Sequence, residues 1–151
     1  MGRIYNAVLK FLREDNWRFS EIEGMPAIRL GMSGRNGNWL CYGHAREEQQ
    51  QFVFYSVCAV KVPEEKRQAM AEFLTRANYG MVIGNFEMDF SDGEIRCKTS
   101  IDVEGERLTS ALIKPLIYAN VAMMDRYLPG INAVIYGGVS PKEAVAQVEG
   151  R

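Results

Sequence analysis

The sequence has few of the side chains from which catalytic and metal sites are usually built. Its 151 residues include one histidine, His44, and three cysteines, Cys41, Cys58 and Cys97, with no Cys-x-x-Cys spacing. Zinc ligands usually come in closely spaced pairs from loops, so this distribution argues against a metal site. His44 and Cys41 lie three residues apart, and on a strand such residues point to opposite faces, which argues against a nucleophile and its base. The sequence therefore predicts no catalytic residue, no metal and no cofactor.

The sequence also lacks an excess of either charge and any long, unbroken apolar run. It has 18 basic and 19 acidic residues, which gives no electrostatic footprint for nucleic acid. The most apolar stretch, residues 111–128, is interrupted by Lys114, Pro115 and Asp125, whereas a bilayer span needs about 20 apolar residues. We expect neither a nucleic-acid partner nor a membrane partner. The odd number of cysteines, all in strand-like runs, favours a reducing compartment, so we expect a cytoplasmic protein.

The clearest local pattern is a hairpin over residues 83–103. Apolar residues alternate with polar ones on both sides of Asp92-Gly93, a dipeptide that fits a two-residue type I′ turn. With this turn, the predicted pairs are Phe90 with Ile95, Asp89 with Arg96, Met88 with Cys97, Glu87 with Lys98 and Phe86 with Thr99. The apolar side chains would lie on a buried face and the two charge pairs on an exposed face.

Periodicity elsewhere predicts helices packed on an antiparallel sheet. One helix is expected over residues 3–15 and another from Pro63, with apolar stripes at Ile4, Val8, Phe11 and Leu12 and at Met70, Phe73, Leu74 and Ala77. The other expected elements are a short strand over 17–22, strands over 27–32, 38–43 and 52–60, a helix from Thr109 or Ser110 to about Leu128, a helical turn or two over 131–136, and a capped helix from Ser140 to Val148. Pro115 predicts a kink and Pro129-Gly130 predicts the end of the long helix. The predicted fold class is α+β, an antiparallel sheet packed against helices, in a single domain over residues 1–151.

Two predicted elements carry more apolar surface than one layer of helices can cover. The run from Phe52 to Val60 is apolar on both faces, and the helix from Ala111 to Leu128 is apolar nearly all round. The extra cover has to come from the C-terminal segment, a partner protein or a second copy of the chain. We expect a homodimer with an isologous contact. The residues expected at the centre of this dimer or partner interface are Phe52, Phe54, Ile117, Met124 and Tyr127.

A second hypothesis, from another class, is a small-molecule-binding protein or an enzyme. It would use a pocket between sheet and helix. The aromatic residues expected to line that pocket are Trp17, Trp39, Tyr42 and Tyr55. A buried carboxylate with a raised pKa in such a pocket would favour this hypothesis.

A set of short motifs is spread over almost the whole chain. They are Trp17 after the first helix, Val62-Pro63-Glu64-Glu65-Lys66-Arg67, Asn78, Gly84-x-Phe86-x-x-Asp89, Leu108-Thr109 and Ser140-Pro141-x-Glu143-Ala144. Together they resemble the YbjN-like bacterial proteins, a family described as a sensory-transduction regulator whose fold is similar to the homodimeric chaperones of type III secretion. The resemblance implies a non-enzymatic bacterial module, chaperone-like or regulatory, that binds another protein. It brings no catalytic residues.

Overall fold

The computed structural model of the protein describes residues 2–151. Its elements are, in chain order, α1 (Arg3–Glu14), β1 (Ser20–Glu21), β2 (Ala27–Ser33), β3 (Asn38–Arg46), β4 (Gln51–Val57), the 3₁₀ turn η1 (Glu64–Lys66), α2 (Arg67–Asn78), β5 (Asn85–Met88), β6 (Ile95–Asp102), α3 (Ser110–Tyr136) and α4 (Pro141–Glu149). The strands form one antiparallel sheet in the order β1-β2-β3-β4-β6-β5. This arrangement confirms the predicted α+β class. One edge of the sheet is β5 and the other is β1, which has only two residues.

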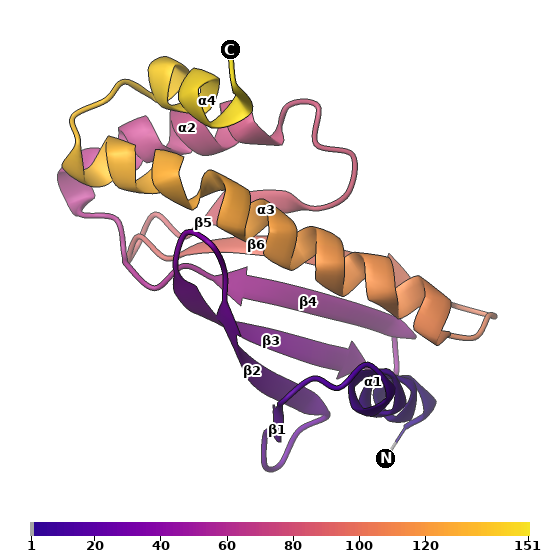
Figure 1. The fold of residues 1–151 in the computed structure, drawn as a ribbon. Helices are drawn as coiled ribbons and strands as arrows, with labels where there is room; N and C mark the ends of the chain where they lie inside the picture. Colours follow the sequence, from indigo (N-terminus) through magenta and orange to yellow (C-terminus); the bar gives the residue numbers. More distant parts are fainter. Residues whose placement is uncertain (1) are drawn as a thin grey trace.

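The helices pack on one side of the sheet, with α3 at the centre of the helical layer (Figure 1). α3 contacts β4 and β6, α1 packs beside it and against β3, and α2 packs beside it and against β5. α4 rests on α2 and α3. The buried side chains of the helices and of one sheet face form a continuous apolar core. Both predicted helical stripes face this core, because all eight of their residues are buried.

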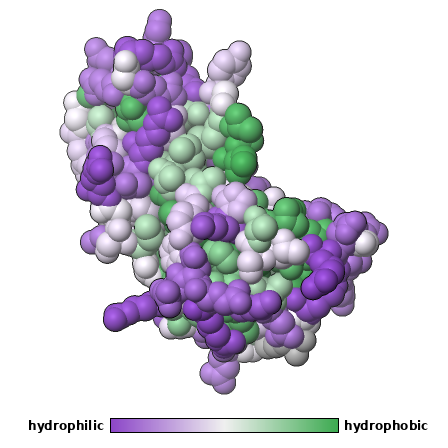
Figure 2. Space-filling view, turned by 45° about the vertical axis from the view of Figure 1, so that its right-hand side comes forward, coloured by the Kyte–Doolittle hydropathy of each residue, from purple (hydrophilic) through white to green (hydrophobic). Residues whose placement is uncertain are grey.

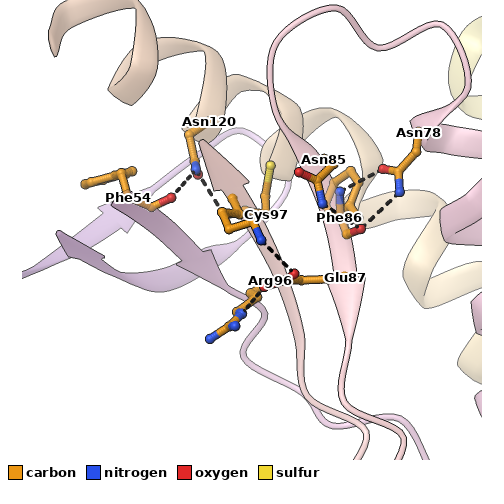
Figure 3. A network of polar contacts seen from close by, with 9 residues as sticks. Phe54, Asn78, Asn85, Phe86, Glu87, Arg96, Cys97 and Asn120 are labelled. Atoms are coloured by element: carbon orange, nitrogen blue, oxygen red, sulfur yellow. Dashed lines mark hydrogen bonds and ion pairs between the residues drawn. The ribbon is translucent and has the colours of Figure 1, made fainter. Parts of the chain in front are cut away.

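A buried asparagine fixes α3 over the two central strands. The Nδ2 atom of Asn120 donates to the carbonyl oxygens of Phe54 on β4, at 2.9 Å, and of Cys97 on β6, at 3.0 Å (Figure 3). Thr99 lies beside it, and its hydroxyl donates to the Leu116 carbonyl at 2.8 Å. Moving α3 over the sheet would break these buried hydrogen bonds, and each buried polar group left unpaired costs about 1–3 kcal/mol. They therefore set which face of α3 meets the sheet.

The first helix is capped from a distant part of the chain. The Glu47 carboxylate, in the turn between β3 and β4, accepts from the backbone N–H groups of Ile4, at 3.2 Å, and Tyr5, at 2.8 Å. The first N–H groups of a helix have no partner within it, and a negative charge there also complements the helix dipole. Gly2 leaves room for this cap, because a Cβ at that position would lie 2.1 Å from Cδ of Glu47.

The pairing of β5 with β6 is shifted by two residues from the predicted register. The observed pairs are Asn85 with Lys98, Phe86 with Cys97, Glu87 with Arg96 and Met88 with Ile95. Because strand side chains alternate with a period of two, this shift leaves every paired residue on its predicted face. Glu87 now contacts both Arg96 and Lys98, while the predicted pair of Asp89 with Arg96 is wrong.

The cause of the shift is a longer loop over residues 89–94. Asp89 accepts from the Ser91 N–H at 2.8 Å and Asp92 from the Glu94 N–H at 2.9 Å, so these side chains stabilise turns of their own. Gly93 has a φ of +80° and lies against Val62, whose N–H donates to the Gly93 carbonyl at 2.9 Å. Phe90 is consequently 54% exposed, which contradicts its predicted burial.

The long helix does not end where Pro129-Gly130 predicts. Its N-cap is Thr109, whose side chain accepts from the Leu112 N–H, and it continues to Tyr136. Beyond Pro129 it buries Ile131, Val134 and Ile135, and this burial outweighs the missing N–H of the proline. α4 then begins as predicted, with Ser140 accepting from the Glu143 N–H at 3.2 Å.

Candidate functional site

The second face of the sheet is not covered by any helix of residues 2–151. Directly paired residues on neighbouring strands share a face, so the register identifies its members. We call this surface the open face. Its main side chains are Arg29 of β2; Leu40, Tyr42, His44 and Arg46 of β3; Gln51, Val53, Tyr55 and Val57 of β4; Arg96, Lys98, Ser100 and Asp102 of β6; and Glu87 of β5.

Two tyrosines form the centre of the open face. Tyr42 and Tyr55 are directly opposite each other on β3 and β4, and both are half-buried. The Arg96 guanidinium lies over the Tyr55 ring, with its central carbon 4.1 Å from the ring centroid. Leu40 and Val57 form the next pair along the same strands, and Leu40 is 46% exposed. The centre of the open face is therefore aromatic and aliphatic, with a cation stacked on it.

A shallow depression lies on each side of the tyrosine pair. One has a volume of about 690 Å³ and its lining includes Gly31, Leu40, Tyr42 and Val57. The other, of about 400 Å³, includes Val53, Tyr55, Lys98 and Ser100 in its lining. There is free space beside Gly31 in the first depression, because a Cβ at this position would meet no atom within 4 Å. Depressions of this kind can accept side chains of another molecule.

The charges of the open face are concentrated around Glu87. Its carboxylate bonds to Nε of Arg96 (Figure 3) and, at 3.2 Å, to Nζ of Lys98. Partial burial raises the pKa of Glu87, but the hydrogen bonds and positive charges of the two basic side chains outweigh burial, so the pKa is lowered overall. Glu87 is thus held ionised and is compensated by its neighbours.

The five residues predicted at the centre of an interface lie elsewhere. Their exposed fractions are only 0–3%, and they belong to the core between α3 and the sheet: Phe52, Phe54, Ile117, Met124 and Tyr127. A side chain that is buried within its own chain offers no area to a second molecule. Any association surface must therefore be formed by other residues. The apolar surplus of α3 is taken up by the sheet, α1, α2 and α4 together.

The four aromatic residues predicted to line a pocket between sheet and helix do not share such a pocket. Trp39 is buried in the core and donates to Ser56 Oγ at 2.9 Å, whereas Trp17 packs edge to face on Tyr118 of α3. Tyr42 and Tyr55 lie on the open face, on the other side of the sheet from Trp39. The space between sheet and helix is filled by the core, and the carboxyl groups with a resolved pKa shift all have lowered values. The condition that would favour the small-molecule hypothesis is therefore not met within residues 2–151.

The cysteines and the histidine occupy separate positions. All three thiols are free and buried, and burial raises the pKa of Cys41 to about 11 and that of Cys97 to about 12. His44 lies on the open face, half-buried, opposite Val53. Among residues 2–151 no group of three His, Cys, Asp or Glu side chains is placed to hold a metal ion. Over the same residues, no helix is long and apolar enough to cross a membrane.

A second exposed apolar group lies in the loop between α2 and β5. Tyr79 is 90% exposed, Val82 is 95% exposed, and Ile83 also reaches the surface. Figure 2 shows strongly hydrophobic residues at one edge of the upper part of the molecule, at the height of this loop in Figure 1. We call residues 79–83 the apolar loop. Sequence reasoning missed it, although four large apolar residues within five positions, with glycines at 80 and 84, could have indicated it.

These features define an α+β domain in which a helical layer covers one face of an antiparallel sheet and leaves the other face open. The chain belongs to the YbjN family, whose family model, described as "Putative bacterial sensory transduction regulator", matches residues 5–133. The match ends before α4. No curated protein matches the chain.

Solved structures share the fold at low sequence identity. The crystal structure of YbjN from E. coli, described as a putative transcription regulator, is 11% identical, with a TM-score of 0.60 and 89% of each chain covered. The Yersinia pestis type III secretion chaperone SycH, in complex with a stable fragment of YscM2, is 9% identical, with a TM-score of 0.52, covering 78% of this chain and 93% of that one. The HopA1-SchA chaperone-effector complex gives 14% identity, a TM-score of 0.51 and coverage of 81% and 91%. These likenesses confirm the predicted resemblance to type III secretion chaperones at the level of the fold.

Proposed function

We propose that the protein is a non-enzymatic binding module, chaperone-like or regulatory, that holds a segment of another protein on its open face. The observation that carries this proposal is the Tyr42 and Tyr55 pair with the exposed Leu40, set between two depressions that no helix of residues 2–151 covers. Aromatic residues with an apolar body and a polar tip are favoured at protein interfaces. The proposal is further supported by SycH and SchA, proteins of this fold whose structures contain a bound polypeptide.

The test is a comparison of two leucines with similar exposure. Leu40 on the open face and Leu112 on α3 are 46% and 41% exposed. The full-length chain, Leu40→Asp and Leu112→Asp would each be used to capture proteins from a bacterial lysate, followed by mass spectrometry. A protein retained by the wild type and by Leu112→Asp, but lost with Leu40→Asp, supports the open face as the binding surface. Retention of the same proteins by both variants would contradict it.

We also propose that two copies of the chain form a homodimer and that they contact each other through the apolar loop. Large side chains such as Tyr79 and Val82 leave apolar area in water, and a two-fold contact between copies would bury it. Light scattering at micromolar concentration should give twice the mass of 17.1 kDa. Val82→Asp should give the mass of one chain, while the exposed Leu112→Asp should remain dimeric. A single-chain mass for the wild type at every concentration would refute the dimer.

We also place the protein in the cytoplasm. The proposal is supported by three free, buried cysteines, which a reducing compartment keeps as thiols.

A further inference from the structure

The open face differs in charge from the rest of the chain. Among the directly paired residues that define it, the open face carries four basic side chains, Arg29, Arg46, Arg96 and Lys98, and two acidic ones, Glu87 and Asp102. Where the ladder ends, the acidic Asp89 and Glu94 line a depression together with Glu87 and Arg96. The whole chain has 18 basic and 19 acidic residues, so 14 basic and 17 acidic residues remain elsewhere. The paired residues of the open face are therefore net positive in a nearly neutral protein, and the acidic groups beside them lie at its hairpin end.

Both acidic groups among these paired residues, Glu87 and Asp102, are already engaged. Glu87 is bonded by Arg96 and Lys98, and Asp102 accepts from Gln51 Nε2 at 2.9 Å and from the Glu104 N–H at 2.9 Å. Arg29, by contrast, is exposed and has no ion-pair or hydrogen-bond partner for its side chain among the described residues. The positive charge of the face is thus only partly compensated from within the chain.

The basic and aromatic groups are arranged in a row across four strands. Arg29, Tyr42, Tyr55 and Lys98 are successive register partners on β2, β3, β4 and β6. Neighbouring strands lie about 4.8 Å apart, so the two basic residues at the ends of the row are separated by roughly 15 Å at the backbone. The row therefore places a cation on each side of an apolar centre. The depressions beside the tyrosines lie within the same span.

A second copy of the chain does not fit this face. A two-fold contact would bring the same net positive surface against itself, and like charges placed against each other disfavour association. The partner that complements the face carries the opposite charge.

We propose that the open face binds an acidic, extended segment of another protein, in which Asp or Glu residues flank apolar side chains. This inference rests on the proposed function and specifies its partner. The acidic residues pair with Arg29, Arg46 and Lys98, and the apolar side chains enter the depressions beside Tyr42 and Tyr55.

The test uses two labelled peptides of about twelve residues with the same central Leu and Phe residues, flanked by Glu in one and by Lys in the other. Fluorescence anisotropy with the full chain should give at least about tenfold tighter binding of the Glu peptide, and added salt should weaken it. The double variant Arg29→Glu/Arg46→Glu should lose this preference. Lys10→Glu/Lys142→Glu changes the net charge equally at exposed sites away from the open face, and should keep the preference. Equal binding of both peptides, or equal loss in both double variants, would overturn the inference.

A third variant separates this inference from the proposed function. Gly31→Val places a side chain in a depression. Its Cβ would meet no atom within 4 Å and Gly31 has no positive φ, so the variant should fold as the wild type does in a urea melt. If both peptides bind the wild type equally and Gly31→Val weakens both, the open face binds polypeptide but does not select acidic ones. If neither Gly31→Val nor the Arg29→Glu/Arg46→Glu variant alters peptide binding, the open face is not the binding surface, and both proposals fail.

Discussion

Asn78 and Phe86 are joined by two hydrogen bonds that imitate a strand pairing. The Phe86 N–H donates to Oδ1 of Asn78 at 2.7 Å, and Nδ2 of Asn78 donates to the Phe86 carbonyl at 3.0 Å (Figure 3). Asn78 is the last residue of α2, and Phe86 lies on β5, the edge strand of the sheet. The side-chain amide therefore occupies backbone groups that would otherwise be open to another strand.

Asn78→Ala should lower the free energy of unfolding by about 1–3 kcal/mol, because the Phe86 N–H loses its partner and the Phe86 carbonyl keeps only the longer bond from Asn85 Nδ2, at 3.3 Å. It should also increase aggregation, since the edge of β5 becomes available for pairing. Urea unfolding and light scattering measure the two effects. Asn132→Ala, at an exposed position of α3, is the control and should change neither.

Phe73→Ala should destabilise the protein by about 3–5 kcal/mol. Phe73 is fully buried and packs edge to face on Tyr127, at 6.3 Å between ring centroids. Its neighbour Glu72 is exposed and forms an ion pair with Arg76, so Glu72→Ala should cost less than about 0.5 kcal/mol. Similar effects of the two substitutions in a urea melt would mean that the buried face of α2 is assigned wrongly.

Gly130→Ala should destabilise α3, although replacing glycine within a helix usually stabilises by about 0.5–1 kcal/mol. A Cβ at this position would lie 2.5 Å from Cζ of Phe73 and 2.9 Å from Cγ2 of Val148. The expected net loss is about 1–3 kcal/mol in thermal or urea unfolding, from overpacking. Gly31→Ala, whose Cβ meets no atom within 4 Å, should show no loss.

Glu87→Gln should change how stability depends on pH. The pKa of Glu87 is lowered from 4.5 in the folded chain, so its ion pairs stabilise fully above that ordinary value and the contribution is lost as pH falls through the lowered pKa. At about pH 7 the variant should be less stable by at most about 1 kcal/mol, because the groups are partly exposed. The difference from the wild type should shrink in urea melts at progressively lower pH. A constant difference would contradict this assignment.

How much of the fold the sequence predicts depends on how local the determining contacts are. The stripes of α1 and α2 and the Ser140 cap follow from spacing alone and are found where they were expected. Spacing also places the cap of α3 at Thr109 or Ser110, and the structure shows Thr109. The register of the hairpin of β5 and β6 does not follow from spacing alone, because the contact of Gly93 with Val62 selects the longer loop. Likewise, α3 passes through Pro129 because burial of Ile131 and Val134 outweighs the local signal.

The site was less predictable than the fold. Phe52 and Phe54 are the most apolar residues of β4, and the sequence alone cannot tell that α3 covers their face and leaves the face of Val53 and Tyr55 open. Assigning the open face requires the pairing of four strands, which are up to about 70 residues apart in the chain. The positive charge of that face is hidden in the composition, because the rest of the chain compensates it.

The cap of α1 predicts that Glu47→Ala lowers stability by about 0.5–2 kcal/mol, whereas the exposed neighbour Glu48→Ala does not. Circular dichroism during urea unfolding measures both. Equal effects would argue against the cap.

The contact between Glu47 and the first turn of α1 also bears on the order in which the chain folds during synthesis. A chain that leaves the ribosome from its N-terminus exposes residues 3–14 well before Glu47, so the first turn of α1 emerges without the carboxylate that later caps it. A twelve-residue helix is marginal by itself in water. We therefore expect the nascent segment to stay largely unfolded until Glu47 has been made, so that α1 forms only after the turn between β3 and β4 is available.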